Sequence, residues 1–203
     1  MHKSVALAHL SKESAISPII NTVELPELNP SGQVYYDLLQ SIVSQQLSIK
    51  AADTIFNRFC ALFPENYPDS KLLIELDNLQ LRNAGLSFQK ASYLKNIAAF
   101  NNQTALDKVN WNNMPDEDII RMLTQIKGVG TWTVQMLLLF TFVRPDVFPI
   151  DDLGIQQGMK KLFKLESEGK QLKQQMLEYA EPWQPWRSYA SRLLWRWKDT
   201  KAA

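Results

Sequence analysis

The stretch Leu123-Thr-Gln-Ile-Lys-Gly-Val-Gly-Thr-Trp-Thr-Val134 decides the fold of this chain. A helical pattern runs into Gly128-Val129-Gly130, and a second helical pattern begins immediately afterwards. Two glycines two positions apart allow the backbone to turn sharply and to approach another surface closely. The second helix then begins with N–H groups that have no partner inside the helix, and such groups bind anions.

Two interpretations of this turn are open. In the first, it is a helix-hairpin-helix that holds a DNA phosphate without reading base sequence. In the second, it is a plain αα-hairpin in which Gly128 is a C-cap and Thr131 is an N-cap. Lys127 lies in the same turn, and phosphate contact and solvent exposure are equally compatible with it.

The flanking segments also have helical periodicity. From Tyr35 to Phe63 apolar residues recur at helical spacing, and a polar interruption from Ser44 to Ser48 predicts two helices with a bend. Further helices are expected over 71–81, 89–100, 115–126, 131–142, 151 or 152 to 163, 171–179 and 186–197. Because no segment shows sustained alternation or a βαβ rhythm, the predicted fold class is all-α.

The amino-acid composition and the charge exclude several classes of protein function. The 203 residues are 45% hydrophobic and carry a net charge of +1, which excludes a histone-like or acidic-tail protein. Charge is uneven, because residues 1–157 hold 12 basic and 16 acidic groups whereas residues 158–203 hold 10 and 5. A single cysteine, Cys60, excludes an internal disulfide and a cysteine-ligated cluster. The only histidines, His2 and His9, argue against a histidine zinc site and a Ser-His-Asp triad.

No segment predicts export or membrane insertion. The first 20 residues carry Lys3, Lys12 and Glu13 and have no unbroken apolar core. The longest apolar stretch, 134–143, is far shorter than the roughly 20 residues that span a bilayer. We expect an intracellular protein without membrane contact, in the bacterial cytoplasm or, in a eukaryote, in the nucleus.

A pair of acids follows the second helix of the hairpin. The segment Asp146-Val-Phe-Pro-Ile-Asp-Asp-Leu-Gly154 places Asp152 twenty residues after Trp132. A proline followed by acids predicts a helix start, where one aspartate accepts hydrogen bonds from the first N–H groups. Since capping needs only one carboxylate, the other is available for chemistry at the mouth of a cleft.

In combination these segments resemble the helix-hairpin-helix DNA glycosylases with a Gly/Pro-rich loop and an essential aspartate, the HhH-GPD family. The AlkA-like 3-methyladenine DNA glycosylase II type is the most similar branch. The resemblance covers most of residues 35–197 and rests on 42–52, 84–91, the hairpin through Asp152, and Trp183-Gln-Pro-Trp-Arg-Ser-Tyr-Ala190 running on to Trp195. It implies one domain over residues 1–203, with two helical lobes, an active-site cleft between them, and the N- and C-terminal segments in one lobe.

The resemblance also implies roles for single residues. Asp152 is expected to be the catalytic carboxylate, with Asp151 as its structural neighbour. The expected base pocket consists of Trp132, Met136, Trp195 and Tyr189, although a buried hydrogen bond or salt bridge is the alternative for Tyr189 and Arg187. The expected DNA contacts are Gln45, Gln46, Leu47, Lys127, Gly128, Val129, Gly130 and Thr131, with Gln46 or Leu47 as the wedge in the gap left by a flipped base. Backbone carbonyls of Thr124, Ile126 and Val129 are expected to hold Na⁺ or K⁺, and the chemistry itself needs no cofactor.

The implied activity is hydrolysis of the N-glycosidic bond of alkylated purines, chiefly 3-methyladenine and 7-methylguanine, in double-stranded DNA by a monomer. Bifunctional relatives place a Schiff-base lysine where this chain has Trp132, so a monofunctional enzyme that leaves an abasic site is expected. Two alternatives are a non-catalytic DNA-binding or damage-sensing module and a related glycosylase for oxidised or deaminated bases. An all-α interaction scaffold leaves the acid pair and the Pro-Trp-Arg-Ser-Tyr segment unexplained.

Overall fold

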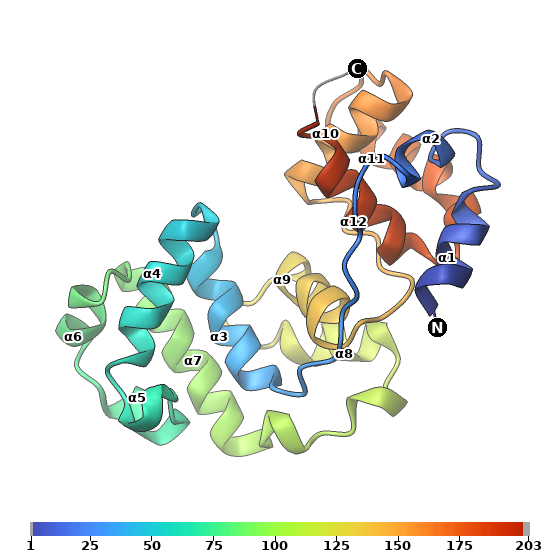
Figure 1. Cartoon of the computed structure of the whole chain (residues 1–203). Helices are drawn as coiled ribbons and strands as arrows, with labels where there is room; N and C mark the ends of the chain where they lie inside the picture. The colour runs from blue at the N-terminus through green and yellow to red at the C-terminus, as the bar shows by residue number, and fades with distance from the viewer. Residues whose placement is uncertain (1, 201–203) are drawn as a thin grey trace. The chain divides into compact units, whose positions relative to one another are not determined.

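A computed structural model describes residues 2–200, so residue 1 and residues 201–203 of the expected domain lie outside the described part. Every regular element in the described residues is a helix, which confirms the predicted all-α class (Figure 1). The chain divides into two compact units, one of Met1–Asn29 with Val143–Ala203 and one of Pro30–Phe142. Within residues 2–200 no helix has both the length and the apolar character needed to cross a membrane.

The unit Pro30–Phe142 is built around α3 (Val34–Ser44), which packs against α4 (Ile49–Cys60) and α7 (Phe88–Thr104). The other elements of this unit are η1 (Pro64–Asn66), α5 (Ser70–Glu75), α6 (Asn78–Asn83), η2 (Leu106–Lys108), η3 (Trp111–Asn113), α8 (Asp116–Leu123), α9 (Thr131–Met136) and the π-helical turn η4 (Leu137–Thr141).

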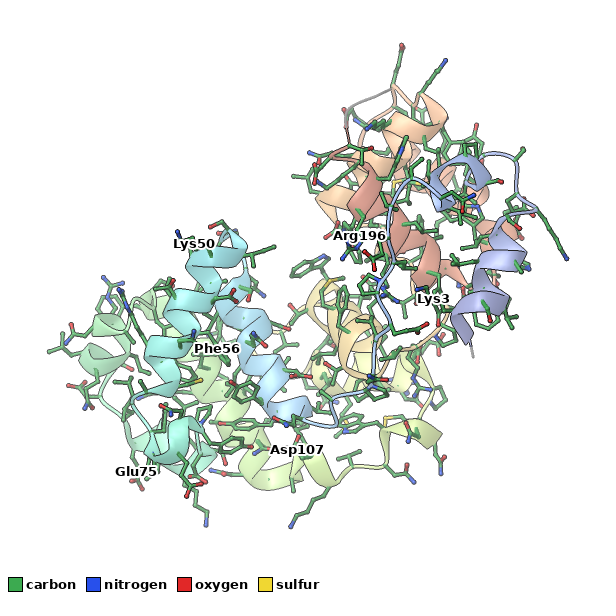
Figure 2. The ribbon with its side chains drawn as sticks, in the orientation of Figure 1. Lys3, Lys50, Phe56, Glu75, Asp107 and Arg196 are labelled. Atoms are coloured by element: carbon green, nitrogen blue, oxygen red, sulfur yellow. The ribbon has the colours of Figure 1, made fainter. Side chains whose placement is uncertain are left out.

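Helix α3 is central because one of its faces is wholly apolar. Leu38, Leu39 and Ile42 have no exposed surface, as the helical spacing predicts. The carboxylate of Asp107 accepts a hydrogen bond from the backbone N–H of Tyr35 at 3.0 Å, which fixes the start of the helix. Phe56 of α4 lies within this unit (Figure 2). Its ring packs edge-on against that of Tyr36, with the ring centroids 5.1 Å apart.

One predicted helix is wrong, since residues 71–81 form α5 and α6 rather than a single helix. Asp77 accepts a hydrogen bond from the N–H of Leu79 at 3.3 Å, and the Gln80 side chain accepts one from the N–H of Asp77 at 3.2 Å. This reciprocal capping box starts a new helix at the position where apolar spacing alone continues the old one.

The other unit contains α1 (His2–Leu10), α2 (Ser17–Ile20), α10 (Leu153–Phe163), α11 (Gly169–Ala180), η5 (Glu181–Trp183) and α12 (Arg187–Trp197). Its core surrounds α12, and Figure 1 shows α1, in blue, beside α12, in red. Packing is tight, since a Cβ at Gly158 would lie 3.1 Å from that of Leu194. The periodicity of the sequence did not predict α1 and α2. Both owe their burial to this contact between the two ends of the chain.

Candidate functional site

The hairpin between α8 and α9 is pressed against α7. Gly128 has a φ of 105°, a left-handed conformation that glycine adopts without strain. A Cβ on this residue would lie 2.2 Å from Cγ of Tyr93. The side-chain amide of Asn96 donates a hydrogen bond to the carbonyl of Lys127 at 3.0 Å. Glycine is therefore required at 128, both by its φ angle and by the tyrosine ring.

The capping predicted for the plain hairpin is wrong at both positions. Helix α8 ends with Thr124, not Gly128, as its C-cap. Helix α9 has Gly130 as its N-cap, so Thr131 is its first residue. No side chain accepts a hydrogen bond at this N-terminus. The turn therefore differs from a side-chain-capped αα-hairpin.

The carbonyl groups of the hairpin have the character of hard-cation ligands. The carbonyl of Ile126 accepts a hydrogen bond from the N–H of Val129 at 2.9 Å and keeps a second lone pair. Within residues 2–200 no hydrogen bond reaches the carbonyl of Thr124 or that of Val129. Neutral oxygen donors of this kind fit a monovalent cation, and the binding itself stays a prediction.

The loop after α3 is anchored by a lysine that the sequence did not single out. The Lys90 ammonium group donates hydrogen bonds to the carbonyls of Val43 and Gln45, both at 2.7 Å. Burial of this group lowers the pKa of Lys90. The Gln45 side chain in turn donates to Thr133 on α9 at 3.1 Å. Lys90 belongs to the 84–91 segment that carried part of the resemblance, but its length and charge alone gave no sign of this role.

The tip of this loop consists of the two candidate wedge residues. Gln46 has a φ of 59°, and Leu47 is 38% exposed. A single apolar side chain with this much exposure is common on protein surfaces and does not by itself mark a wedge. The choice between Gln46 and Leu47 therefore stays open.

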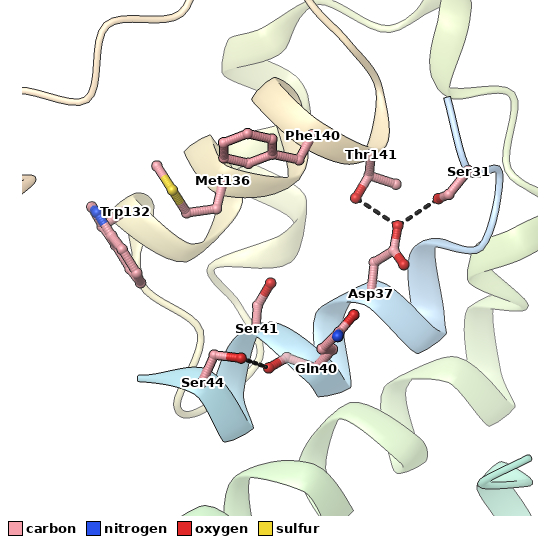
Figure 3. Close-up of a pocket in the computed structure, with 9 residues that line it drawn as sticks. All are labelled: Ser31, Asp37, Gln40, Ser41, Ser44, Trp132, Met136, Phe140 and Thr141. Atoms are coloured by element: carbon pink, nitrogen blue, oxygen red, sulfur yellow. Dashed lines mark hydrogen bonds between the residues drawn. The ribbon is translucent and has the colours of Figure 1, made fainter. Parts of the chain in front are cut away.

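A cavity of about 400 Å³ lies within the unit Pro30–Phe142, between α3 and the α9–η4 segment (Figure 3). Trp132, Met136 and Phe140 form its apolar side, so the two expected pocket residues of this unit do line one cavity. The polar lining residues are Ser31, Asp37, Gln40, Ser41, Ser44 and Thr141. This polar side was not predicted from the sequence. Its only signal was the helical spacing of positions 37, 40, 41 and 44.

Asp152 is itself the N-cap of α10. Its Oδ1 accepts hydrogen bonds from the N–H of Ile155 at 2.9 Å and from the indole Nε1 of Trp195 at 2.6 Å. The other acid, Asp151, lies 2.5 Å from the ammonium of Lys173. One aspartate of the pair therefore caps the helix, as expected, and it is the candidate catalytic acid Asp152. The same carboxylate caps the helix and binds the indole.

Gly154 makes the contact between indole and carboxylate sterically feasible. A Cβ at this position would lie 2.8 Å from Cδ1 and 3.1 Å from Nε1 of Trp195. Glycine in a first helical turn costs roughly 1 kcal/mol relative to alanine. A glycine at this unfavourable position was the one sign in the sequence that another group comes close to it. The structure shows that this group is the indole of Trp195.

Tyr189 and Arg187 lie elsewhere in the same unit. Tyr189 is only 8% exposed. Its ring packs edge-on against that of Trp186, with the ring centroids 5.8 Å apart. Burial raises the pKa of Tyr189. Arg187 forms a two-pronged ion pair with Asp146, at 2.7 and 2.8 Å, which confirms the salt-bridge alternative for Arg187. A base-contacting role for Tyr189 stays a prediction.

A family model, a related sequence and two solved structures all indicate similarity to the same class of DNA repair proteins. The model for "HhH-GPD superfamily base excision DNA repair protein" matches residues 39–185. DNA-3-methyladenine glycosylase 1 of Schizosaccharomyces pombe is 37% identical over 164 residues, which cover 80% of this chain and 71% of that protein. The solved structure of an S. pombe 3-methyladenine DNA glycosylase in complex with abasic DNA has a TM-score of 0.83 and 33% identity, covering 97% of this chain and 99% of that one. A DNA-3-methyladenine glycosidase from Bacillus halodurans has a TM-score of 0.78 and 31% identity, covering 95% and 88%.

Gly128→Ala is expected to destabilise the protein by about 1–3 kcal/mol, because the new methyl group meets the Tyr93 ring in a strained backbone. Urea unfolding followed by circular dichroism measures the change. Gly130→Ala is the matched control, since a Cβ there has no atom within 4 Å. The account of the turn fails if the two variants are equally stable.

Gly154→Ala is expected to displace the Trp195 indole and to break its hydrogen bond to Asp152. The readout is the indole N–H resonance of Trp195 in a ¹H–¹⁵N spectrum, assigned by its disappearance in Trp195→Phe. This resonance should move upfield when the bond to the carboxylate is lost. An unchanged resonance in Gly154→Ala would contradict the steric argument.

Proposed function

Because the chain belongs to the HhH-GPD superfamily of base excision DNA repair proteins, we propose that it is a DNA glycosylase that removes alkylated purines from double-stranded DNA. The two S. pombe matches and the B. halodurans structure support this substrate class, since all carry 3-methyladenine glycosylase or glycosidase names. The abasic DNA in one of those structures supports DNA as the partner.

The observation that carries the proposal is the fixed carboxylate of Asp152. Its Oδ1 is held by the N–H of Ile155 and the indole of Trp195. A helix N-terminus interacts favourably with a negative charge placed at it. Departure of a base from deoxyribose leaves positive charge on the sugar, as in glycoside hydrolysis. An oriented carboxylate would stabilise that charge and direct a water to the anomeric carbon.

The cavity lined by Trp132 is the proposed base pocket. A base must leave the duplex to be reached, which costs a few kcal/mol. Stacking on an aromatic ring recovers roughly 1–3 kcal/mol per base. Alkylation at a ring nitrogen also makes the purine a better leaving group, so less general-acid help is needed. A volume of about 400 Å³ is ample for one purine.

The hairpin and the loop after α3 are the proposed DNA contacts. The hairpin from Lys127 to Thr131 would hold a phosphate, aided by a monovalent cation on the carbonyls of Thr124, Ile126 and Val129. Lys90 fixes the backbone of the loop whose tip would fill the gap left by the flipped base. Trp132 at the position of the lyase lysine supports hydrolysis without strand cleavage. We further propose that the protein acts as a monomer.

The decisive variant is Asp152→Asn. Asparagine caps a helix about as well as aspartate, so folding is preserved while the negative charge is lost. Release of 3-methyladenine and 7-methylguanine from methylated duplex DNA is expected to fall by at least roughly 100-fold. Chromatography of the freed bases measures the loss. Asp151→Asn, which removes the partner of Lys173, is the control and should stay near wild type.

Three outcomes would contradict parts of this proposal. DNA binding without base release by the wild type would favour a non-catalytic module. Release of oxidised or deaminated bases alone would change the substrate class. Strand breaks before alkali treatment would show lyase activity and contradict the monofunctional assignment.

A further inference from the structure

The carboxylate of Asp37 lies in the wall of the Trp132 cavity and is held by two hydroxyl groups. Its Oδ2 accepts hydrogen bonds from Thr141 at 2.8 Å and from Ser31 at 2.5 Å (Figure 3). Both donors also line the cavity. Two hydrogen bonds to one oxygen orient the carboxylate.

This carboxylate has no cationic partner in the described part of the chain. Within residues 2–200, no lysine, arginine or histidine forms an ion pair with Asp37. Asp146 and Asp151, in contrast, each pair with a basic side chain. A partly buried charge without a partner is costly, and a ligand of opposite charge relieves that cost.

The remaining lining of the cavity is apolar or neutral. Of the described residues that line it, none is a lysine or arginine, and Asp37 alone carries a formal charge. Across from α3, the segment α9–η4 contributes the indole of Trp132, the thioether of Met136 and the ring of Phe140 (Figure 3). Aromatic faces attract cations, and a thioether is polarizable. Ser41 and Gln40 add neutral hydrogen-bonding groups on the α3 side.

We propose that Asp37 is a specificity-determining residue that makes the pocket prefer positively charged purines over neutral ones. The inference rests on the proposed function. A purine alkylated at N3 or N7 while still joined to deoxyribose carries a positive charge, and an unmodified purine carries none. A carboxylate at one end of the cavity would therefore discriminate on charge, independently of the stacking surface of Trp132. At the short range and partial burial of this site, such an attraction is worth roughly tenfold or more in affinity.

Asp37 also links Ser31, at the start of its unit, to Thr141, the last residue of η4. The test must therefore distinguish a role in ligand charge recognition from a purely structural role. Asp37→Asn removes the charge but keeps a carbonyl oxygen that can accept from both hydroxyls. Thr141→Val removes one of the hydrogen bonds and keeps the charge. A structural role predicts similar losses in the two variants. The charge role predicts a selective loss in Asp37→Asn.

The first test measures binding and is independent of catalysis. Quenching of tryptophan fluorescence by 1,7-dimethylguanosine, a permanent cation, is compared with quenching by neutral 1-methylguanosine. Wild type and Thr141→Val are expected to bind the cation at least about tenfold more tightly, and Asp37→Asn should lose that preference. Equal affinity of the wild type for the two nucleosides would overturn the inference, whether or not the protein is a glycosylase.

The second test uses single-turnover base release from duplexes with either 7-methylguanine or neutral hypoxanthine. Asp37→Asn should slow release of 7-methylguanine by at least about tenfold relative to hypoxanthine. An equal loss on both bases, or none, would overturn the inference. Ser41→Lys introduces a positive charge on the same wall and leaves Asp37 intact. The Ser41→Lys variant should also bind the cationic nucleoside more weakly than the wild type does. This variant keeps the inference testable if Asp37→Asn fails to fold.

Discussion

Oδ1 of Asp152 accepts hydrogen bonds from the N–H of Ile155 and from the indole of Trp195, and the proposed chemistry depends on this pair of contacts. The first bond ties the carboxylate to the start of α10, and the second ties it to α12. Gly154 is the condition for the second bond, because any side chain there would meet the indole. One residue thus serves helix capping, packing between two helices and the candidate reaction. A stability assay and an activity assay will therefore report on the same carboxylate.

In the unit Pro30–Phe142, contacts with side chains of α7 likewise fix the backbone of the proposed DNA-binding segments. Gly128 lies flat against the ring of Tyr93, which sets the position of the hairpin relative to α7. Lys90, also on α7, holds the carbonyls at the end of α3, which sets the position of the loop tip. Helix α7 therefore positions both proposed DNA contacts.

The cavity in that unit combines two ways to recognise an alkylated base. Trp132 offers a π-face, which any base can stack on and which a cationic base prefers. Asp37 offers a formal charge that only a cationic base would match. If both act, shape and stacking set how tightly a base is held. Charge then sets which base is chosen.

The local sequence determined a large part of this protein. Apolar spacing along α3, α4 and α12 predicted helices, since burial of one face stabilises them. The glycines of the hairpin, the paired acids before α10 and Trp132 carried the family resemblance. These features are readable because each depends on neighbours within a few positions or on a fixed spacing along the chain.

Tertiary structure decided the rest. That Asp152 rather than Asp151 caps α10 depends on Lys173 and Trp195, which are distant in sequence. The burial of α1 and α2 depends on the opposite end of the chain. Among residues 2–200, the fold brings Ser31 and Thr141 rather than a basic side chain to the carboxylate of Asp37. Periodicity shows which face of a helix is buried, but it does not show which distant side chain will meet that face.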